Sequence, residues 1–140
     1  MKVPMRLFLL SWLCAAHAIV TNCNTYSLLQ VRSLSIQPQE IVYPGQNITL
    51  RMNYTSPDDI VDGVSLISTR YNYIFTNSFK DSICKSVVCP IRRGQREERF
   101  VYNIPEWLMG SMNTRIVWND ANHTPLLCLD ISLKIKSKMN

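Results

Sequence analysis

Two cysteines close a short segment in the middle of the chain, Cys84-Lys85-Ser86-Val87-Val88-Cys89-Pro90-Ile91. They lie five positions apart, and the proline that follows the second cysteine disfavours a helix at this point. In an oxidising compartment this spacing is typical of a disulfide that clamps the mouth of a β-hairpin. We therefore expect a secreted chain that is rich in β-structure on both sides of this clamp.

The N-terminus has the three parts of a secretory signal peptide. Lys2 and Arg6 provide the positive start, a short apolar run follows, and Ala16-His17-Ala18 forms a cleavage site. The apolar run is too short to span a bilayer, which argues against a retained anchor helix. We predict a signal peptide at residues 1–18 and one mature domain at residues 19–140. The predicted location is the secreted fraction or the lumen of the endolysosomal pathway.

The cysteine count agrees with that compartment. Cleavage at the predicted site removes Cys14 and leaves four cysteines, an even number that indicates two disulfides. Four cysteines allow three pairings, and the sequence alone does not select one, although proximity favours Cys84 with Cys89 and leaves Cys23 for Cys128. Zinc is the rival interpretation, but it requires two close ligand pairs, and Cys23 and Cys128 have no near cysteine neighbour. We expect no metal.

Alternation of apolar and polar residues recurs along the mature chain and predicts strands. In the segment 47–55 every second residue is apolar, namely Ile48, Leu50, Met52 and Tyr54. We expect a similar strand near 29–36, with a slip in phase around Ser33, and others at 98–104, 114–118 and 127–136. A further strand is expected to present one face of Ile67, Thr69, Tyr71, Tyr73 and Phe75.

Seven or eight short strands, each with one apolar face, predict two packed sheets in an all-β, immunoglobulin-like sandwich. Turn residues separate the strands, for example Pro44-Gly45 and Arg93-Gly94. The buried Cys…Trp…Cys pattern of immunoglobulin domains is absent, because the cysteines lie near the domain ends and in one loop. We therefore expect that no disulfide pins the two sheets together through the core.

Three N-glycosylation sequons begin at Asn47, Asn53 and Asn122. The first two asparagines fall on the polar face of the strand at 47–55, and the third falls in a predicted hairpin loop. All three positions suit a glycan, since each is expected to face solvent.

The charge of the mature chain is mildly positive, with 13 basic and 10 acidic residues. Its basic residues are not interleaved with stacking aromatic residues, which argues against nucleic acid as a partner. One cluster contains Arg92, Arg93, Arg96 and Arg99. It is either a solvated hairpin flank or a contact for anionic lipid headgroups.

Residues for catalysis are scarce. The only histidine of the mature chain is His123, which lies inside a sequon without an obvious nucleophile or orienting partner. Asp58, Asp59 and Asp62 lack the spacing of an EF-hand calcium loop and are better explained as a polar turn. We expect no enzyme activity and no cofactor.

Several motifs together resemble the ML (MD-two-related lipid-recognition) domain family. They are Asp81-Ser82-Ile83-Cys84-Lys85-Ser86, Cys89-Pro90-Ile91-Arg92-Arg93-Gly94, Asn103-Ile104-Pro105, the spacing from Trp118 to Cys128, and Pro44-Gly45-Gln46-Asn47-Ile48-Thr49-Leu50. The resemblance extends from about Cys23 to Ile135. This family includes a lysosomal sterol carrier and the phosphatidylglycerol/phosphatidylinositol transfer proteins.

The resemblance implies a two-sheet sandwich that holds lipid between its sheets, with disulfides Cys84–Cys89 and Cys23–Cys128. One departure concerns the ligand. The sterol-carrier branch has a third disulfide before its first long strand, and residues 37–46 contain no cysteine here. A sterol is therefore not directly implied, and the ligand is either a sterol or a phospholipid.

The lipid site implied by the resemblance has apolar walls on the inner faces and a rim near the clamp and after Ile104-Pro105. An alternative for the rim segment Trp107-Leu108-Met109 is a loop folded onto the core. The predicted lipid-binding residues are Met52, Tyr54, Tyr71, Tyr73, Phe75, Phe79, Phe100, Trp107, Leu108, Met109, Ile116 and Leu133.

The predicted function is that of a monomeric lipid carrier, which holds one sterol or phospholipid and makes transient contact with a membrane or receptor. The alternative is an immunoglobulin-like accessory module, whose outer surface binds a receptor and whose core is filled by side chains. The two functions differ in whether a cavity lies between the sheets.

Overall fold

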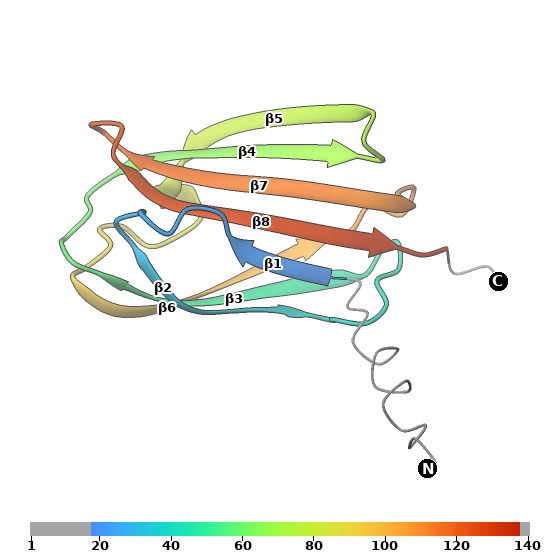
Figure 1. The fold of residues 1–140 in the computed structure, drawn as a ribbon, viewed down its shortest axis with the longest axis horizontal. Coiled ribbons are helices and arrows are strands. Elements are labelled where there is room, and N and C mark those ends of the chain that lie inside the picture. Colours follow the sequence, from blue (N-terminus) through green and yellow to red (C-terminus); the bar gives the residue numbers. More distant parts are fainter. Residues whose placement is uncertain (1–17, 138–140) are drawn as a thin grey trace, which may run out of the picture.

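The computed structural model describes residues 18–137, and eight strands account for most of them (Figure 1). The predicted signal peptide lies almost wholly outside the described residues, and β1 begins at Ala18. The strands are β1 Ala18–Asn22, β2 Gln30–Gln37, β3 Asn47–Ser56, β4 Gly63–Tyr71, β5 Phe75–Ser82, β6 Gly94–Asn103, β7 Gly110–Asp120 and β8 Pro125–Ile135, with a 3-10 turn η2 at Ile83–Lys85.

The strands form two antiparallel sheets that face one another. One sheet has five strands in the order β1-β8-β7-β4-β5, and the other has three in the order β2-β3-β6. Figure 1 shows the wider sheet lying across the narrower one, as two layers of a sandwich. The predicted all-β, two-sheet fold is confirmed.

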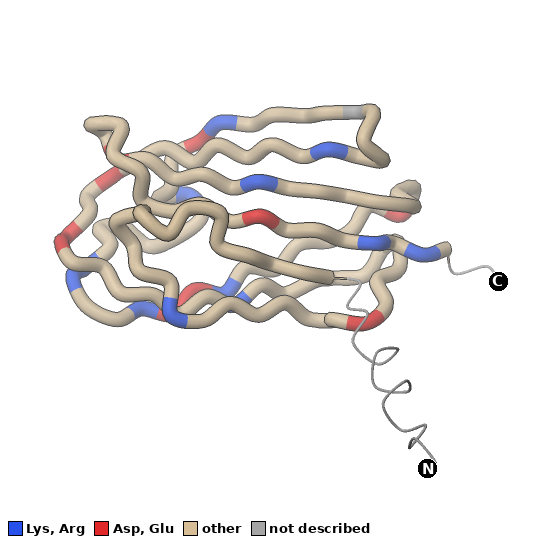
Figure 2. Tube along the Cα trace, viewed as in Figure 1, with Lys and Arg blue, Asp and Glu red and all other residues tan. Residues whose placement is uncertain are grey.

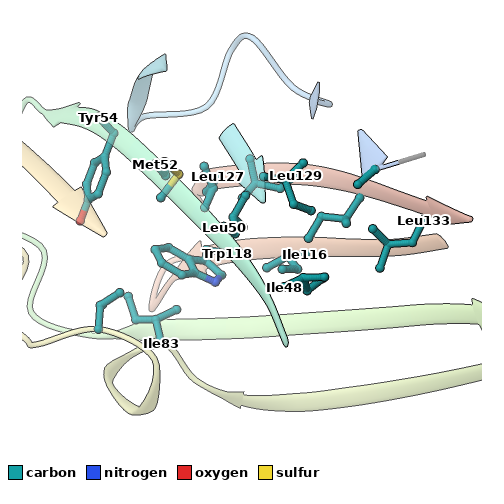
Figure 3. Packing of buried hydrophobic residues seen from close by; sticks show 14 of the residues in the cluster. Ile48, Leu50, Met52, Tyr54, Ile83, Ile116, Trp118, Leu127, Leu129 and Leu133 are labelled. Carbon is teal, nitrogen blue, oxygen red and sulfur yellow. The ribbon is translucent and has the colours of Figure 1, made fainter. Parts of the chain in front are cut away.

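The core forms where the apolar rows of the two sheets meet. Ile48, Leu50, Met52 and Tyr54 of β3 are all buried, as the alternation predicts, because successive residues of a strand point to opposite faces. Figure 3 shows this row facing Ile116 and Trp118 of β7 and Leu127, Leu129 and Leu133 of β8. The expected phase slip in β2 is also present, as a shift in register between Val31 and Ser33.

The prediction that one strand runs through Tyr73 and Phe75 is wrong. β4 ends at Tyr71, and the backbone turns at Asn72 and Tyr73, which have φ angles of 50° and 62°. Ile74 then donates its N–H to the carbonyl oxygen of Tyr71, which closes the turn at 3.1 Å. Phe75 therefore begins β5 and pairs with Tyr71 on the neighbouring strand.

The segment closed by Cys84 and Cys89 is not the mouth of a hairpin. The disulfide is present, but β5 pairs with β4 in the wider sheet, whereas β6 pairs with β3 in the narrower one. The segment therefore carries the chain from one sheet to the other. The local reason is η2, in which the Ser82 hydroxyl accepts a hydrogen bond from the Cys84 N–H and turns the chain out of β5.

The second disulfide joins Cys23, just after β1, to Cys128 in the adjacent strand β8. Both strands belong to the wider sheet. Neither disulfide crosses the core between the sheets, as predicted. Side-chain packing holds the two sheets together, and the segments on either side of β2 add backbone hydrogen bonds to β8 and the chain after it, such as Leu29 N–H to the Leu126 carbonyl oxygen at 3.0 Å and Lys136 N–H to the Val42 carbonyl oxygen at 2.9 Å.

Charged residues are dispersed along the chain, and acidic residues lie near the basic cluster of residues 92–99 (Figure 2). Arg96 has its Nη2 atom 2.9 Å from Oε1 of Glu98 and also donates to the carbonyl oxygens of Val88 and Pro90. Arg96 therefore holds the clamp loop against β6. Arg92 lies 3.7 Å from Asp59. Two of the four arginines are paired within the protein.

Candidate functional site

A cavity of about 220 Å³ lies between the two sheets. Its walls come from inner-face residues of β3, β4, β6, β7 and β8 and from the chain that follows β6, so the cavity is continuous with the hydrophobic core. The lining residues are Ile48, Ile67, Thr69, Tyr71, Tyr102, Asn103, Ile104, Pro105, Met112, Thr114, Ile116 and Ile131.

One polar pair interrupts this mostly apolar wall. Thr69 of β4 and Thr114 of β7 are directly opposite in the ladder, and their hydroxyl oxygens lie 3.2 Å apart. The two hydroxyls can hydrogen-bond to each other. The pair can therefore face an apolar ligand while each hydroxyl keeps a hydrogen-bond partner.

The cavity is bounded at one end by Tyr71. This residue also lines a surface hollow of about 310 Å³, which is formed with Asn72, Ile74, Trp107, Leu108 and Met109. The rings of Tyr71 and Trp107 lie 5.9 Å apart between centroids, at an angle of 55°. The side chains of Ile74, Trp107 and Met109 face solvent, and we call these three residues the apolar rim.

Two residues hold the apolar rim in place. Oδ1 of Asn72 accepts the N–H of Ser111 at 2.8 Å, and its Nδ2 donates to the carbonyl oxygen of Met109 at 3.2 Å. Gly110 has a φ of +102°, and a Cβ atom there would collide with the carboxamide of Asn72. The turn after β4 is thereby fastened to the start of β7, which brings Ile74 next to Trp107 and Met109.

The opposite end of the space between the sheets is narrow. A void of about 10 Å³ lies there, and it shares Ile67, Tyr102 and Ile116 with the larger cavity. Phe100 and Trp118 line this void and pack edge to face, with centroids 6.4 Å apart. The inter-sheet space is therefore much smaller at this end than beside the apolar rim.

A larger hollow, of about 570 Å³, lies on the outer face of the wider sheet. Polar and charged side chains dominate it, and the Arg115–Asp130 ion pair crosses it at 2.8 Å. It does not enclose an apolar guest. The inter-sheet cavity is therefore the better candidate site, although it is smaller.

The structure brings together about half of the sequence-predicted site residues. Tyr71 and Ile116 line the cavity, and Phe100 lines the narrow void. Trp107, Leu108 and Met109 line the surface hollow, with Leu108 itself buried and the other two exposed. The segment after Ile104-Pro105 is thus divided between rim and core.

The other predicted residues lie elsewhere. Met52 and Leu133 are buried in the core but do not line the cavity. Phe79, on the edge strand β5, is 57% exposed, and Tyr73 faces solvent in the turn. The side chain of Phe75 lies outside the described part of the structure.

Tyr54 is also buried away from the cavity. Its hydroxyl donates to Oε1 of Glu98 at 3.0 Å. Burial, and then the negative charge of Glu98, raises the pKa of the Tyr54 hydroxyl above its usual value. This hydrogen bond joins β3 to β6 within the narrower sheet, and Tyr54 does not line the cavity.

The sequence prediction omitted several lining residues, among them Ile67, Thr69, Tyr102 and Thr114. All four lie on the inner faces that the alternation identifies, so the period-two pattern contained this signal. Asn103 and Pro105 carry no such signal, because Asn103 is out of phase with the inner face of β6 and Pro105 lies in the loop after it. Met112 is in phase with Thr114 on β7, but the predicted strand began at Thr114. Within residues 18–137, no cluster of three or more potential metal ligands is present.

The comparisons with known proteins agree with this geometry. The ML domain family model matches residues 17–135. A phosphatidylglycerol/phosphatidylinositol transfer protein of Mycosarcoma maydis is 26% identical over 124 residues, which cover 81% of this chain and 64% of that protein. The chain therefore spans less than two thirds of the length of this relative.

Two solved structures share the fold. A Niemann-Pick type C2 protein from the Japanese carpenter ant has a TM-score of 0.64 and 16% identity, covering 84% of this chain and 99% of its own. Chicken MD-1, solved in complex with lipid IVa, has a TM-score of 0.53 and 10% identity, covering 83% and 96%. With the family match over most of its length, the chain belongs to the ML domain family.

Proposed function

We propose that this protein binds one lipid between its two sheets and transfers it through the apolar rim. The observation that carries the proposal is the position of Tyr71, which lines both the inter-sheet cavity and the surface hollow beside Trp107. An apolar cavity next to exposed apolar side chains is the arrangement that a lipid carrier needs.

The cavity must widen to hold a whole lipid, because its volume of about 220 Å³ is below the about 300–1,000 Å³ of common ligand sites. Widening is feasible, since neither disulfide joins the two sheets. Burial of about 400 Å² of lipid surface would contribute on the order of 10 kcal/mol. Association and ordering costs reduce that figure and leave micromolar or tighter affinity.

The ligand we propose is a phospholipid or a sterol. The name of the fungal relative favours a phospholipid, and so does the absence of cysteine from residues 37–46. The proposed role includes no chemical step, because the cavity is lined without a histidine or a carboxylate that could act as a base.

The proposed setting is the secretory pathway, outside the cell or in the endolysosomal lumen. Two disulfides and the signal-peptide pattern support it. Asn47, Asn53 and Asn122 are all exposed, which supports N-glycosylation at the three sequons. Removal of N-glycans from secreted protein should lower its mass, and unchanged mass would exclude this modification.

The proposed encounter with a membrane or receptor is transient and uses the apolar rim, with the protein acting as a monomer. Ile74 is 90% exposed and Trp107 is 72% exposed, so both side chains are available for such contact. Within residues 18–137 no helix is long and apolar enough to cross a bilayer.

A second candidate function is a receptor-binding accessory module with a side-chain-filled core. The small volume of the cavity, about 220 Å³, and the hollow on the outer face favour this alternative. In that case the outer face of the wider sheet would carry the contact, and no lipid would be required.

Native mass spectrometry of protein from a eukaryotic secretory host, followed by lipid extraction, tests the two candidates. A stoichiometric lipid, identified as phospholipid or sterol, supports the carrier. A mass that corresponds to the protein without lipid, together with no uptake of fluorescent phospholipid or sterol after delipidation, would overturn the carrier proposal and favour the accessory module.

A further inference from the structure

Ser65 carries a buried hydroxyl group without a hydrogen-bond partner. The residue lies on the inner face of β4 and is only 2% exposed. Among the described residues, two buried side-chain oxygen atoms lack a partner, Oγ of Ser27 and Oγ of Ser65. Ser27 lies in the loop between β1 and β2, whereas Ser65 lines the narrow void between the sheets.

An unpaired hydroxyl at this place needs an explanation, because buried polar groups in native proteins are almost always hydrogen-bonded. The void beside Ser65 measures about 10 Å³, which is the lower limit for one water molecule. Its other walls include the apolar residues Phe100, Trp118, Leu127 and Leu129, and the hydroxyl-bearing residues Ser86 and Tyr102 also line it without a hydrogen bond to Ser65. The Ser65 hydroxyl is therefore available to a bound lipid that carries a polar group of its own.

The strand β4 connects this hydroxyl to the rim. Tyr71, Thr69, Ile67 and Ser65 follow one another on its inner face, with Tyr71 at the mouth. At the usual rise of a strand, Ser65 lies about 20 Å from Tyr71. Ile67 and Ile116 line both the cavity and the void. A lipid that entered at the rim and widened the space between the sheets would bring its leading end to Ser65.

We propose that Ser65 is a polar contact for the leading end of the bound lipid. The protein would then prefer a lipid with a hydroxyl or carbonyl group on its buried end to the same lipid ending in plain hydrocarbon. The inference rests on the proposed function, because it requires that a lipid occupies the inter-sheet cavity. It makes Ser65 a residue that determines ligand preference.

The preference for a lipid with a polar buried end should equal the contribution of one hydrogen bond in an apolar site. Such a bond favours the matched ligand by about tenfold in affinity. The Ser65→Ala variant removes the hydroxyl and keeps the volume small, so it should bind both ligands equally. Ser27→Ala makes the same chemical change at the other unpaired hydroxyl, which lines neither the cavity nor the narrow void, and is the matched control.

Two pairs of probes test the preference with delipidated, fully oxidised protein. One pair is phosphatidylglycerol with plain acyl chains and the same lipid with a hydroxyl on the end of one chain. The other pair is cholesterol and cholesterol hydroxylated at the end of its side chain. Competition against a fluorescent lipid gives the affinity of each probe for the wild-type protein, Ser65→Ala and Ser27→Ala.

We expect the wild-type protein and Ser27→Ala to prefer the hydroxylated member of at least one pair by about tenfold. We expect Ser65→Ala to lose that preference while it still binds the plain lipid and unfolds at an unchanged or higher temperature. Equal affinities in the wild-type protein, or a preference that survives in Ser65→Ala, would overturn this inference and leave the carrier function standing. Failure of all four probes to bind would overturn both.

Discussion

The aromatic rings of Tyr71 and Trp107 lie against one another, with centroids 5.9 Å apart, where the inter-sheet cavity meets the protein surface. Tyr71 ends strand β4, and Trp107 belongs to the loop between β6 and β7. The contact therefore joins the wider sheet to the loop that leaves the narrower one. A guest that enters the cavity at this end must pass or displace this pair of rings.

The Trp107→Asp variant should transfer lipid between vesicles at least about tenfold more slowly. A carboxylate at the rim is costly to bring into an apolar membrane surface, and the ring contact with Tyr71 is lost. The fold should stay intact because Trp107 is largely exposed. Fluorescent lipid transfer and circular dichroism measure the two properties.

Tyr26→Asp is the control for that variant, since Tyr26 is also an exposed aromatic residue but lies in the loop between β1 and β2. It should leave the transfer rate unchanged. If Trp107→Asp transferred lipid as fast as the control, the entrance would lie elsewhere.

The Gly110→Ala variant should be less stable by about 1–2 kcal/mol and slower in lipid transfer. Gly110 adopts a φ of +102°, and a methyl group there would push against the carboxamide of Asn72, which holds the rim. Gly94→Ala is the matched control, because Gly94 has a φ of +115° and open space beside it. Equal losses of stability and transfer in both variants would mean that backbone strain alone is responsible.

The free energy of unfolding should fall as the pH rises above about 10. Burial raises the pKa of Tyr102 and, with help from Glu98, that of Tyr54. The unfolded chain loses these protons near pH 10, whereas the folded protein retains them to higher pH. The stabilisation is therefore complete below about pH 10 and is lost as the pH increases through the raised values.

Urea unfolding at a series of pH values measures this effect. The Tyr102→Phe variant should show a shallower fall than the wild-type protein, and Tyr26→Phe should show the same fall as the wild-type protein. A fall of equal steepness in all three proteins would assign the effect to other groups.

The two disulfides should differ in their contribution to stability. The loop closed by Cys23–Cys128 spans 105 positions, and that closed by Cys84–Cys89 spans 5. In the chain-entropy account, replacing the first pair with serine should cost about 5 kcal/mol and replacing the second about 2 kcal/mol. Denaturant unfolding of the two double variants compares them, and a larger loss from the short loop would contradict the chain-entropy account.

The sequence predicted the strands with a regular period and missed the turn after Tyr71. β3 alternates along its whole length and β8 alternates from Leu129 onward, so these buried rows followed directly from the pattern. The turn after Tyr71 contains neither glycine nor proline, and apolar residues continue in phase through Phe75, which hid the reversal at Asn72 and Tyr73. The reversal is fixed by the hydrogen bond from Ile74 N–H to the Tyr71 carbonyl oxygen and by the tertiary contacts of Asn72 with Met109 and Ser111.

The candidate site was predictable in outline only. Alternation identifies which residues face inward, but it does not distinguish those that line a cavity, such as Ile67, from those that fill the core, such as Met52. That difference depends on the distance between the sheets at each point, which no local pattern records. Ser65 lies one period before Ile67 and was missed because the predicted strand began at Ile67, whereas β4 begins at Gly63.

The far end of the inter-sheet space is closed, because Ile83, Val87 and Trp118 are buried there. A guest that enters tail first at Tyr71 can therefore leave only by reversing, with its head leading. In the proposed carrier, loading and unloading would use the same opening, so the protein could not contact the donor and the acceptor at the same moment. In the proposed carrier, delivery would then proceed by alternating encounters with the donor and the acceptor.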